Sequence, residues 1–192
     1  MIAETSIMAN ATFYFEWLGV DKNDFRILSL LAPTGEYTGN LSDMCRSLNI
    51  SAQTTNRNKL KTSIKELSEC GYITSSLNGR TYTLRAIPKE TVIEIPTEWL
   101  NKIMNGNYSS ESVSWQVVLK VFLWLLIKKV PIAKRYMIAN DINCGVDTIT
   151  SALNVLERDF NAIIREYICV RDFLDCSYHR LGFKATPTAW WE

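Results

Sequence analysis

The amino-acid sequence predicts an α+β fold, mainly α-helical, in which a set of helices followed by a small β-hairpin occurs twice. Three observations support this prediction. Apolar residues recur at helical spacing from Leu41 onward, an Asn-Gly pair at residues 78 and 79 separates two strand-like segments, and the same order of segments returns in the second half of the chain. A chain of 192 residues is long enough for two small domains.

Two helices are expected between residues 41 and 71. Asn40 can cap the first turn of the first helix, and Ser51 is the cap candidate for the second. The second helix is expected to arise from the polar segment that runs from Ala52 to Ser63, and Cys70-Gly71 ends it, because glycine adopts a left-handed conformation at little cost. The apolar residues that mark the inward faces of the two helices are Leu41, Met44, Cys45, Leu48, Leu60, Ile64 and Leu67.

A β-hairpin is expected directly after the second helix. Tyr72-Ile73 opens its first strand, and Asn78-Gly79 is the strongest short-range signal for its turn. The alternation from Thr81 to Leu84 predicts the return strand, which carries Arg80 and Arg85 at its two ends.

These residues carry a resemblance to a known family. Ile64-Lys65-Glu66-Leu67 followed by Cys70-Gly71-Tyr72-Ile73 resembles the end of the recognition helix in bacterial winged helix-turn-helix proteins, and the likeness extends from Asp21 to Arg85. It implies a module that reads DNA with a helix and a hairpin wing. Between Ser51 and Ile64 there are about five more residues than in the compact form of the motif, so the start of the recognition helix stays open.

The chain also repeats the order of its own segments. The repeat predicts tandem winged helix-turn-helix domains, while a single winged domain followed by an unrelated helical domain remains the alternative. A second hairpin is expected from Tyr167 to Val170 and from His179 to Lys184. The matching pieces are Glu16-Trp17-Leu18 with Glu98-Trp99-Leu100, Phe25–Leu31 with Leu119–Leu125, Leu48-Asn49 with Ile142-Asn143, and Ile64/Leu67 with Leu153/Leu156.

Three regions follow from this repeat. Residues 1–87 are expected to form the DNA-reading domain, and residues 88–112 a linker and loop that contain a strand-like segment between Pro88 and Pro96. Residues 113–192 are expected to form a second, winged-helix-like domain that dimerises or clamps the DNA backbone. The apolar segment from Val117 to Ile127 is too short to span a membrane and is either a buried core helix or the surface of a homodimer.

Composition favours an ordinary globular protein, with 47% hydrophobic and 21% charged residues. The start of the chain lacks the pattern of a signal peptide, and five cysteines without an export signal predict reduced thiols in a cytoplasm. The sequence has one histidine, His179, and no Cys-x-x-Cys pair, phosphate-binding glycine loop or nucleophile motif. We therefore expect no enzyme activity, metal, cofactor, small-molecule substrate or membrane partner.

Local charge predicts the binding partner, since the net charge is only +1. The segment from Ser51 to Lys65 contains cations and no acidic residue, and amides and hydroxyls that can contact base edges lie between the cations. A solvated basic helix face is the alternative. The candidate DNA-binding residues here and in the hairpin are Gln53, Thr54, Thr55, Asn56, Arg57, Asn58, Lys59, Lys61, Lys65, Arg80 and Arg85.

The corresponding helix of the second half, Val146 to Asp159, is acidic and would repel phosphate. Its acidic residues are Asp147, Glu157 and Asp159, against Arg158 alone. Basic residues of this half gather instead after the apolar helix, and we expect them to clamp the DNA backbone: Lys128, Lys129, Lys134 and Arg135.

The sequence thus predicts a double-stranded DNA-binding protein of a bacterial plasmid, phage or other mobile element. Tandem winged domains resemble plasmid replication initiators, which implies a role in replication initiation, transfer or maintenance, with binding as a homodimer. Two alternatives stay open. One is a transcriptional repressor that binds an operator, and the other is a tandem winged-helix scaffold that binds protein partners.

Overall fold

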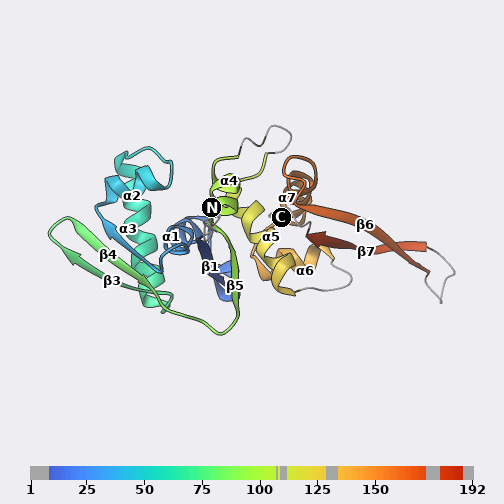
Figure 1. Ribbon diagram of the computed structural model, residues 1–192, viewed down its shortest axis with the longest axis horizontal. Helices are drawn as coiled ribbons and strands as arrows, with labels where there is room; N and C mark the ends of the chain where they lie inside the picture. Colours follow the sequence, from blue (N-terminus) through green and yellow to red (C-terminus); the bar gives the residue numbers. More distant parts are fainter. Residues whose placement is uncertain (1–8, 107, 109–111, 129–133, 172–177, 188–192) are drawn as a thin grey trace, which may run out of the picture. The chain divides into compact units, whose positions relative to one another are not determined.

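A computed structural model of the chain describes residues 9–106, 108, 112–128, 134–171 and 178–187, without the side chains of residues 166–171 and 178–187. The chain divides into two compact units, Met1–Asn101 and Lys102–Glu192. Each unit combines α-helices with short antiparallel strands (Figure 1). The α+β class predicted from the sequence, with a predominance of helix, is therefore confirmed.

The first unit contains a two-stranded sheet that joins distant parts of the sequence. Strand β1 (Asn10–Tyr14) pairs antiparallel with β5 (Val92–Pro96). The short 3-10 helix η1 (Phe15–Gly19) follows β1 directly. Part of the range expected to be a linker thus forms a strand within the first unit.

Three helices form the core of the first unit, namely α1 (Lys22–Leu31), α2 (Leu41–Ser47) and α3 (Thr54–Glu69). Both α1 and α2 pack against α3. The apolar faces predicted for α2 and α3 are confirmed except at Leu41, which is only half-buried and lines a surface groove. The other spaced residues are buried together with the aromatic side chains of β1, η1 and α1: Phe13, Trp17, Phe25, Met44, Cys45, Leu48, Leu60, Ile64 and Leu67.

The start of α3 differs from the expectation. Gln53, not Ser51, occupies the N-cap position, and its side chain makes no capping hydrogen bond. The Ser51 carbonyl oxygen instead accepts a hydrogen bond of 2.9 Å from Nδ2 of Asn56. The end of α3 agrees with the expectation, because Gly71 has a φ of 69° just past the C-cap.

A three-stranded antiparallel sheet completes the first unit, with β4 (Thr81–Ala86) between β2 (Glu36–Gly39) and β3 (Ile73–Asn78). Asn78 pairs with Thr81, so the two-residue hairpin loop is Gly79-Arg80, not the Asn-Gly pair itself. Gly79 has a φ of 62°, which suits glycine at the first position of such a loop. This turn places Arg80 at the tip of the hairpin.

The second unit has the same succession of helices and hairpin. Helix α7 packs against α5 and α6, and also against β6 of the hairpin, while the boundary between the units falls within α4. Both strands expected here are confirmed as an antiparallel pair. The elements are α4 (Thr97–Met104), α5 (Trp115–Lys128), α6 (Arg135–Asp141), α7 (Val146–Arg158), β6 (Ile163–Arg171) and β7 (Tyr178–Pro187).

Helix α5 is buried within the chain. Every residue from Val118 to Leu125 is buried, including Lys120. The chain itself therefore covers the apolar faces of this helix, and the alternative of a dimer surface along α5 is wrong. No helix in the described ranges combines the length and the apolar character that a membrane span requires.

The two units repeat one local geometry in detail. Helices α2 and α6 each have seven residues, and each is followed by an asparagine with a left-handed backbone, Asn49 (φ 51°) and Asn143 (φ 53°). The next N–H group bonds back to the helix in both turns, from Ile50 to the Cys45 oxygen at 2.9 Å and from Cys144 to the Ala139 oxygen at 3.0 Å. The helices that follow these turns differ in length, since α3 has 16 residues and α7 has 13.

Candidate nucleic-acid interface

The polar face of α3 points away from the protein core. Leu60, Ser63, Ile64 and Leu67 occupy the buried face of the helix. Gln53 just before the helix is exposed as well. The exposed side chains on the helix itself include both the cations and the small polar residues of the candidate set: Thr54, Thr55, Asn58, Lys59, Lys61 and Lys65.

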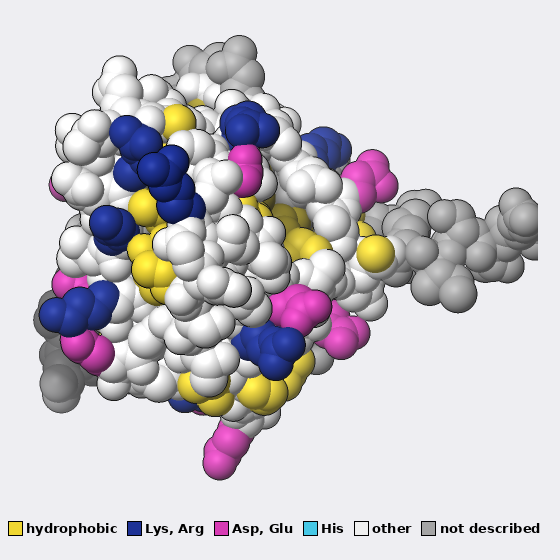
Figure 2. Space-filling model, turned by 90° about the vertical axis from the view of Figure 1, so that its left-hand side faces the viewer, with side chains coloured by type: hydrophobic (Ala, Val, Ile, Leu, Met, Phe, Trp, Pro, Cys, Tyr) yellow, Lys and Arg dark blue, Asp and Glu magenta, His cyan; other side chains and the backbone are white. Residues whose placement is uncertain are grey.

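A groove of about 390 Å³ separates α3 from the β3–β4 hairpin and the start of α2. Arg57 and Lys61 reach it from α3, and Arg80 reaches it from the hairpin turn. Leu41 at the start of α2 and the cross-strand pair Leu77 and Tyr82 also line it. Figure 2 shows this end of the first unit, where Lys and Arg side chains gather around a few hydrophobic ones.

The three groove cations have no ion pair within the described part of the chain, and only Arg57 makes a hydrogen bond, of 3.4 Å from Nη2 to Oγ1 of Thr54. By contrast, the Lys65 ammonium lies 3.7 Å from Glu69, and the Arg85 guanidinium lies 3.3 Å from Glu36. Uncompensated cations that share one concave surface create a positive potential that attracts anions.

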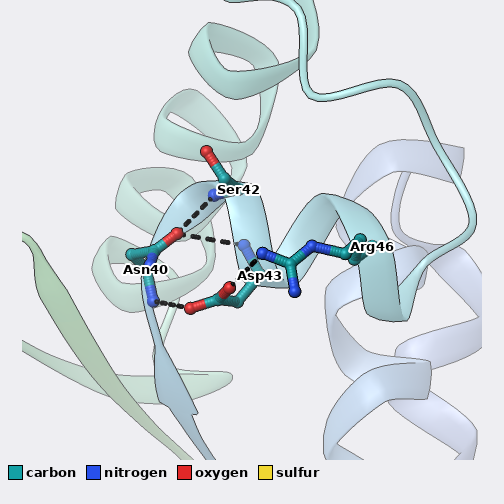
Figure 3. Close-up of polar contacts among 4 residues, drawn as sticks. All are labelled: Asn40, Ser42, Asp43 and Arg46. Carbon is teal, nitrogen blue, oxygen red and sulfur yellow. Dashed lines mark hydrogen bonds and ion pairs between the residues drawn. The ribbon is translucent and has the colours of Figure 1, made fainter.

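The backbone amides at the start of α2 do not add to this potential. The Asn40 side chain accepts hydrogen bonds from the N–H groups of Ser42 (2.8 Å) and Asp43 (3.0 Å), and Asp43 accepts one from the Asn40 N–H group (Figure 3). Asp43 also holds the Arg46 guanidinium at 2.8 Å. This reciprocal cap satisfies the helix end, so the anion attraction of the groove comes from its cationic side chains.

This cap gives a stability prediction. Replacing Asn40 with alanine removes the acceptor for two amides at the wall of the groove, so we expect the free energy of unfolding to fall by about 1–2 kcal/mol. Urea unfolding followed by circular dichroism measures the change. Asn40→Asp keeps an acceptor and should lose much less, and equal losses in both variants would contradict the capping role.

One candidate DNA-binding residue on α3 makes a hydrogen bond within the protein. Asn56 is half-buried, and its amide group donates to the Ser51 carbonyl oxygen. Thr55, Asn58 and Lys59 line a second groove, of about 460 Å³, between α3 and the start of α1. That groove also contains acidic residues, among them Asp21 and Glu66, so its potential is less positive.

Three of the four basic residues predicted to clamp DNA in the second unit have partners inside the protein. The Lys128 ammonium lies 3.5 Å from Asp141, and Arg135 donates a hydrogen bond of 3.0 Å to Oγ1 of Thr150. The Lys134 ammonium lies 5.8 Å from the centroid of the Tyr136 ring, and Lys129 lies outside the described residues. No convergent set of unpaired cations like that of the first unit is found among the described residues here.

Sequence reasoning missed the apolar part of the groove and a buried arginine. Leu77 and Tyr82 face each other across the hairpin, which their positions on either side of the turn could have indicated. Arg165 is buried against α7, where its Nε lies 2.9 Å from Glu157 and its Nη2 lies 2.8 Å from Asn154. Glu157 is therefore committed to an internal ion pair.

Comparisons of the chain with protein-family models and with curated proteins found no match. Within the described ranges, no group of three or more His, Cys, Asp or Glu residues is placed to hold a metal ion.

Close to the groove, burial raises the pKa of the Cys45 thiol, while the positive charge of Arg57 opposes the shift. A buried thiol of raised pKa is unreactive and serves packing.

Proposed function

We propose that the protein binds double-stranded DNA through its first unit. The observation that supports this most strongly is the convergence of Arg57, Lys61 and Arg80 on one groove without any acidic partner in the described chain. Helix α3 would lie in the major groove, and the hairpin tip would reach the adjacent minor groove or its backbone. The protein groove between α3 and the hairpin would then face the sugar–phosphate backbone that separates the major from the minor groove of the DNA.

The remaining polar residues of α3 suit base contacts. Thr54, Thr55 and Asn58 are exposed on the helix surface and carry hydroxyl and amide groups that donate and accept hydrogen bonds. An asparagine can make two hydrogen bonds to adenine in the major groove. Cations therefore position the helix on the backbone, while its amide and hydroxyl groups read the sequence.

The repeated turns at Asn49 and Asn143 support tandem winged helix-turn-helix units that came from one ancestral unit. On this basis we place the protein among DNA-binding proteins of a plasmid, phage or other mobile element, with a role in replication initiation, transfer or maintenance. Repression at an operator uses the same contacts and is the second candidate. Selection of bound fragments from random duplex DNA gives the target, and paired half-sites among them would indicate a homodimer.

The dependence of affinity on salt tests DNA binding directly. If the three groove cations and Lys59 each neutralise a phosphate, the logarithm of affinity should fall with the logarithm of salt at a slope of about −3 to −4. Fluorescence anisotropy with a labelled duplex measures this slope. A protein-interaction scaffold would bind no duplex even at low salt, and that result would overturn the proposal.

A further inference from the structure

The walls of the groove combine two kinds of chemistry. Arg57, Lys61 and Arg80 supply positive charge, whereas Leu41 and Leu77 supply apolar surface. The rest of the lining comes from Asn40, Ser42, Gly79 and Tyr82. Leu77 is 56% exposed, and its neighbours in the groove include all three unpaired cations. A site for phosphate alone would be lined by hydrogen-bond donors. The apolar surface suits a part of the ligand that is itself apolar.

We propose that the groove selects the deoxyribose backbone of one DNA strand. This inference rests on the proposed DNA-binding function. The sugars of the strand would lie against Leu77 and Leu41, while the phosphates that flank them meet Arg57, Lys61 and Arg80. A DNA strand presents this alternation of apolar sugar faces and anionic phosphates along its length.

The choice of deoxyribose over ribose follows from the hydroxyl group that distinguishes them. The 2′-hydroxyl of ribose is both a donor and an acceptor of hydrogen bonds. Against a leucine side chain it loses contact with water, and the leucine itself offers no hydrogen-bond partner, which costs free energy. We expect Leu77 to determine the preference for deoxyribose, because its exposed apolar side chain lies in the same groove as the three cations.

Two labelled duplexes test the inference with the full-length protein at low salt. One is a two-turn DNA duplex of mixed sequence, and the other has the same sequence with ribose at every third nucleotide of both strands. Circular dichroism of the duplexes alone checks that both keep the B form. We expect the wild-type protein to bind the ribose-containing duplex about fivefold more weakly than the all-deoxy duplex. This ratio corresponds to the lower end of the cost of burying an unsatisfied polar group, because the groove is partly open.

Variants at Leu77 make the test specific. Leu77→Thr offers a hydroxyl partner within a strand-forming residue, so it should bind the two duplexes within about twofold of each other. Leu77→Val keeps the surface apolar and should retain the wild-type preference. Val92→Thr makes the corresponding polar change at a strand residue that is 51% exposed and does not line the groove, and it should behave like the wild type.

The outcomes separate this inference from the function on which it rests. Equal binding of both duplexes by the wild type, or tighter binding of the ribose-containing one, overturns the selection of deoxyribose and leaves duplex binding in place. Loss of the preference in Val92→Thr, or its persistence in Leu77→Thr, overturns the role of Leu77. Failure of the wild type to bind the all-deoxy duplex would instead overturn the proposed function itself.

Discussion

Replacement of Arg57, Lys61 and Arg80 together by glutamine should lower the affinity for duplex DNA by roughly a thousandfold. Each of these side chains can make a charge-assisted hydrogen bond to phosphate, and each such bond contributes about 1.5 kcal/mol or more, close to tenfold in affinity. Because none of the three is held by an ion pair in the described chain, the substitution should leave the fold intact. Fluorescence anisotropy with one labelled duplex measures the loss.

A matched control removes the same amount of charge from outside the groove. The triple variant Lys65→Gln, Arg85→Gln, Arg158→Gln also loses three positive charges, two of them from ion pairs with Glu69 and Glu36. We expect the affinity of this control variant to fall by less than about tenfold, and its salt slope to change by less than about 1. The groove variant loses three phosphate contacts, so its salt slope should become less negative by about 3. Equal losses in the two variants would show that overall charge, not the groove, governs binding.

The sequence predicted those parts of the fold that depend on neighbouring residues. The cap at Asn40 and the left-handed Gly71 both follow from local rules, and the spacing of Leu60, Ile64 and Leu67 marked the inward face of α3. The prediction of Ser51 as the N-cap of α3 was wrong, because Gln53 occupies that position and the capping preference of Ser51 was overridden. The Asn56 amide holds the Ser51 carbonyl, and this contact depends on the turn that is formed there, not on residue preference.

The groove required information that no local pattern carries. Arg57 and Arg80 belong to different elements, and they meet because β3 packs against α3 and the turn falls at Gly79-Arg80. Arg80 and Arg85 looked equivalent in the sequence. The register between β2 and β4 sets Glu36 opposite Arg85, so that of these two arginines Arg80 alone has no ion-pair partner among the described residues. The burial of α5 likewise depends on elements far from it in sequence.

Substitution of Phe13 by alanine should strongly destabilise the first unit. Phe13 is fully buried on β1, with its ring centroid 6.0 Å from that of Trp17 and 6.1 Å from that of Phe25. Loss of a buried phenylalanine leaves a cavity and costs about 3–5 kcal/mol, a large fraction of the 5–15 kcal/mol that is typical of a folded domain. Urea unfolding of the full chain, followed by tryptophan fluorescence, measures the change.

Two controls show whether this effect comes from packing. Phe13→Leu keeps most of the volume and should cost less than about 1.5 kcal/mol, while Val92→Ala, at an exposed position of the paired strand β5, should stay within about 0.5 kcal/mol of the wild type. Phe13 does not line the groove. At a temperature where Phe13→Ala is still folded, it should therefore bind DNA as tightly as the wild type. Weakened binding by the folded variant would mean that the aromatic core adjusts the position of α3, and would contradict a purely structural role for Phe13.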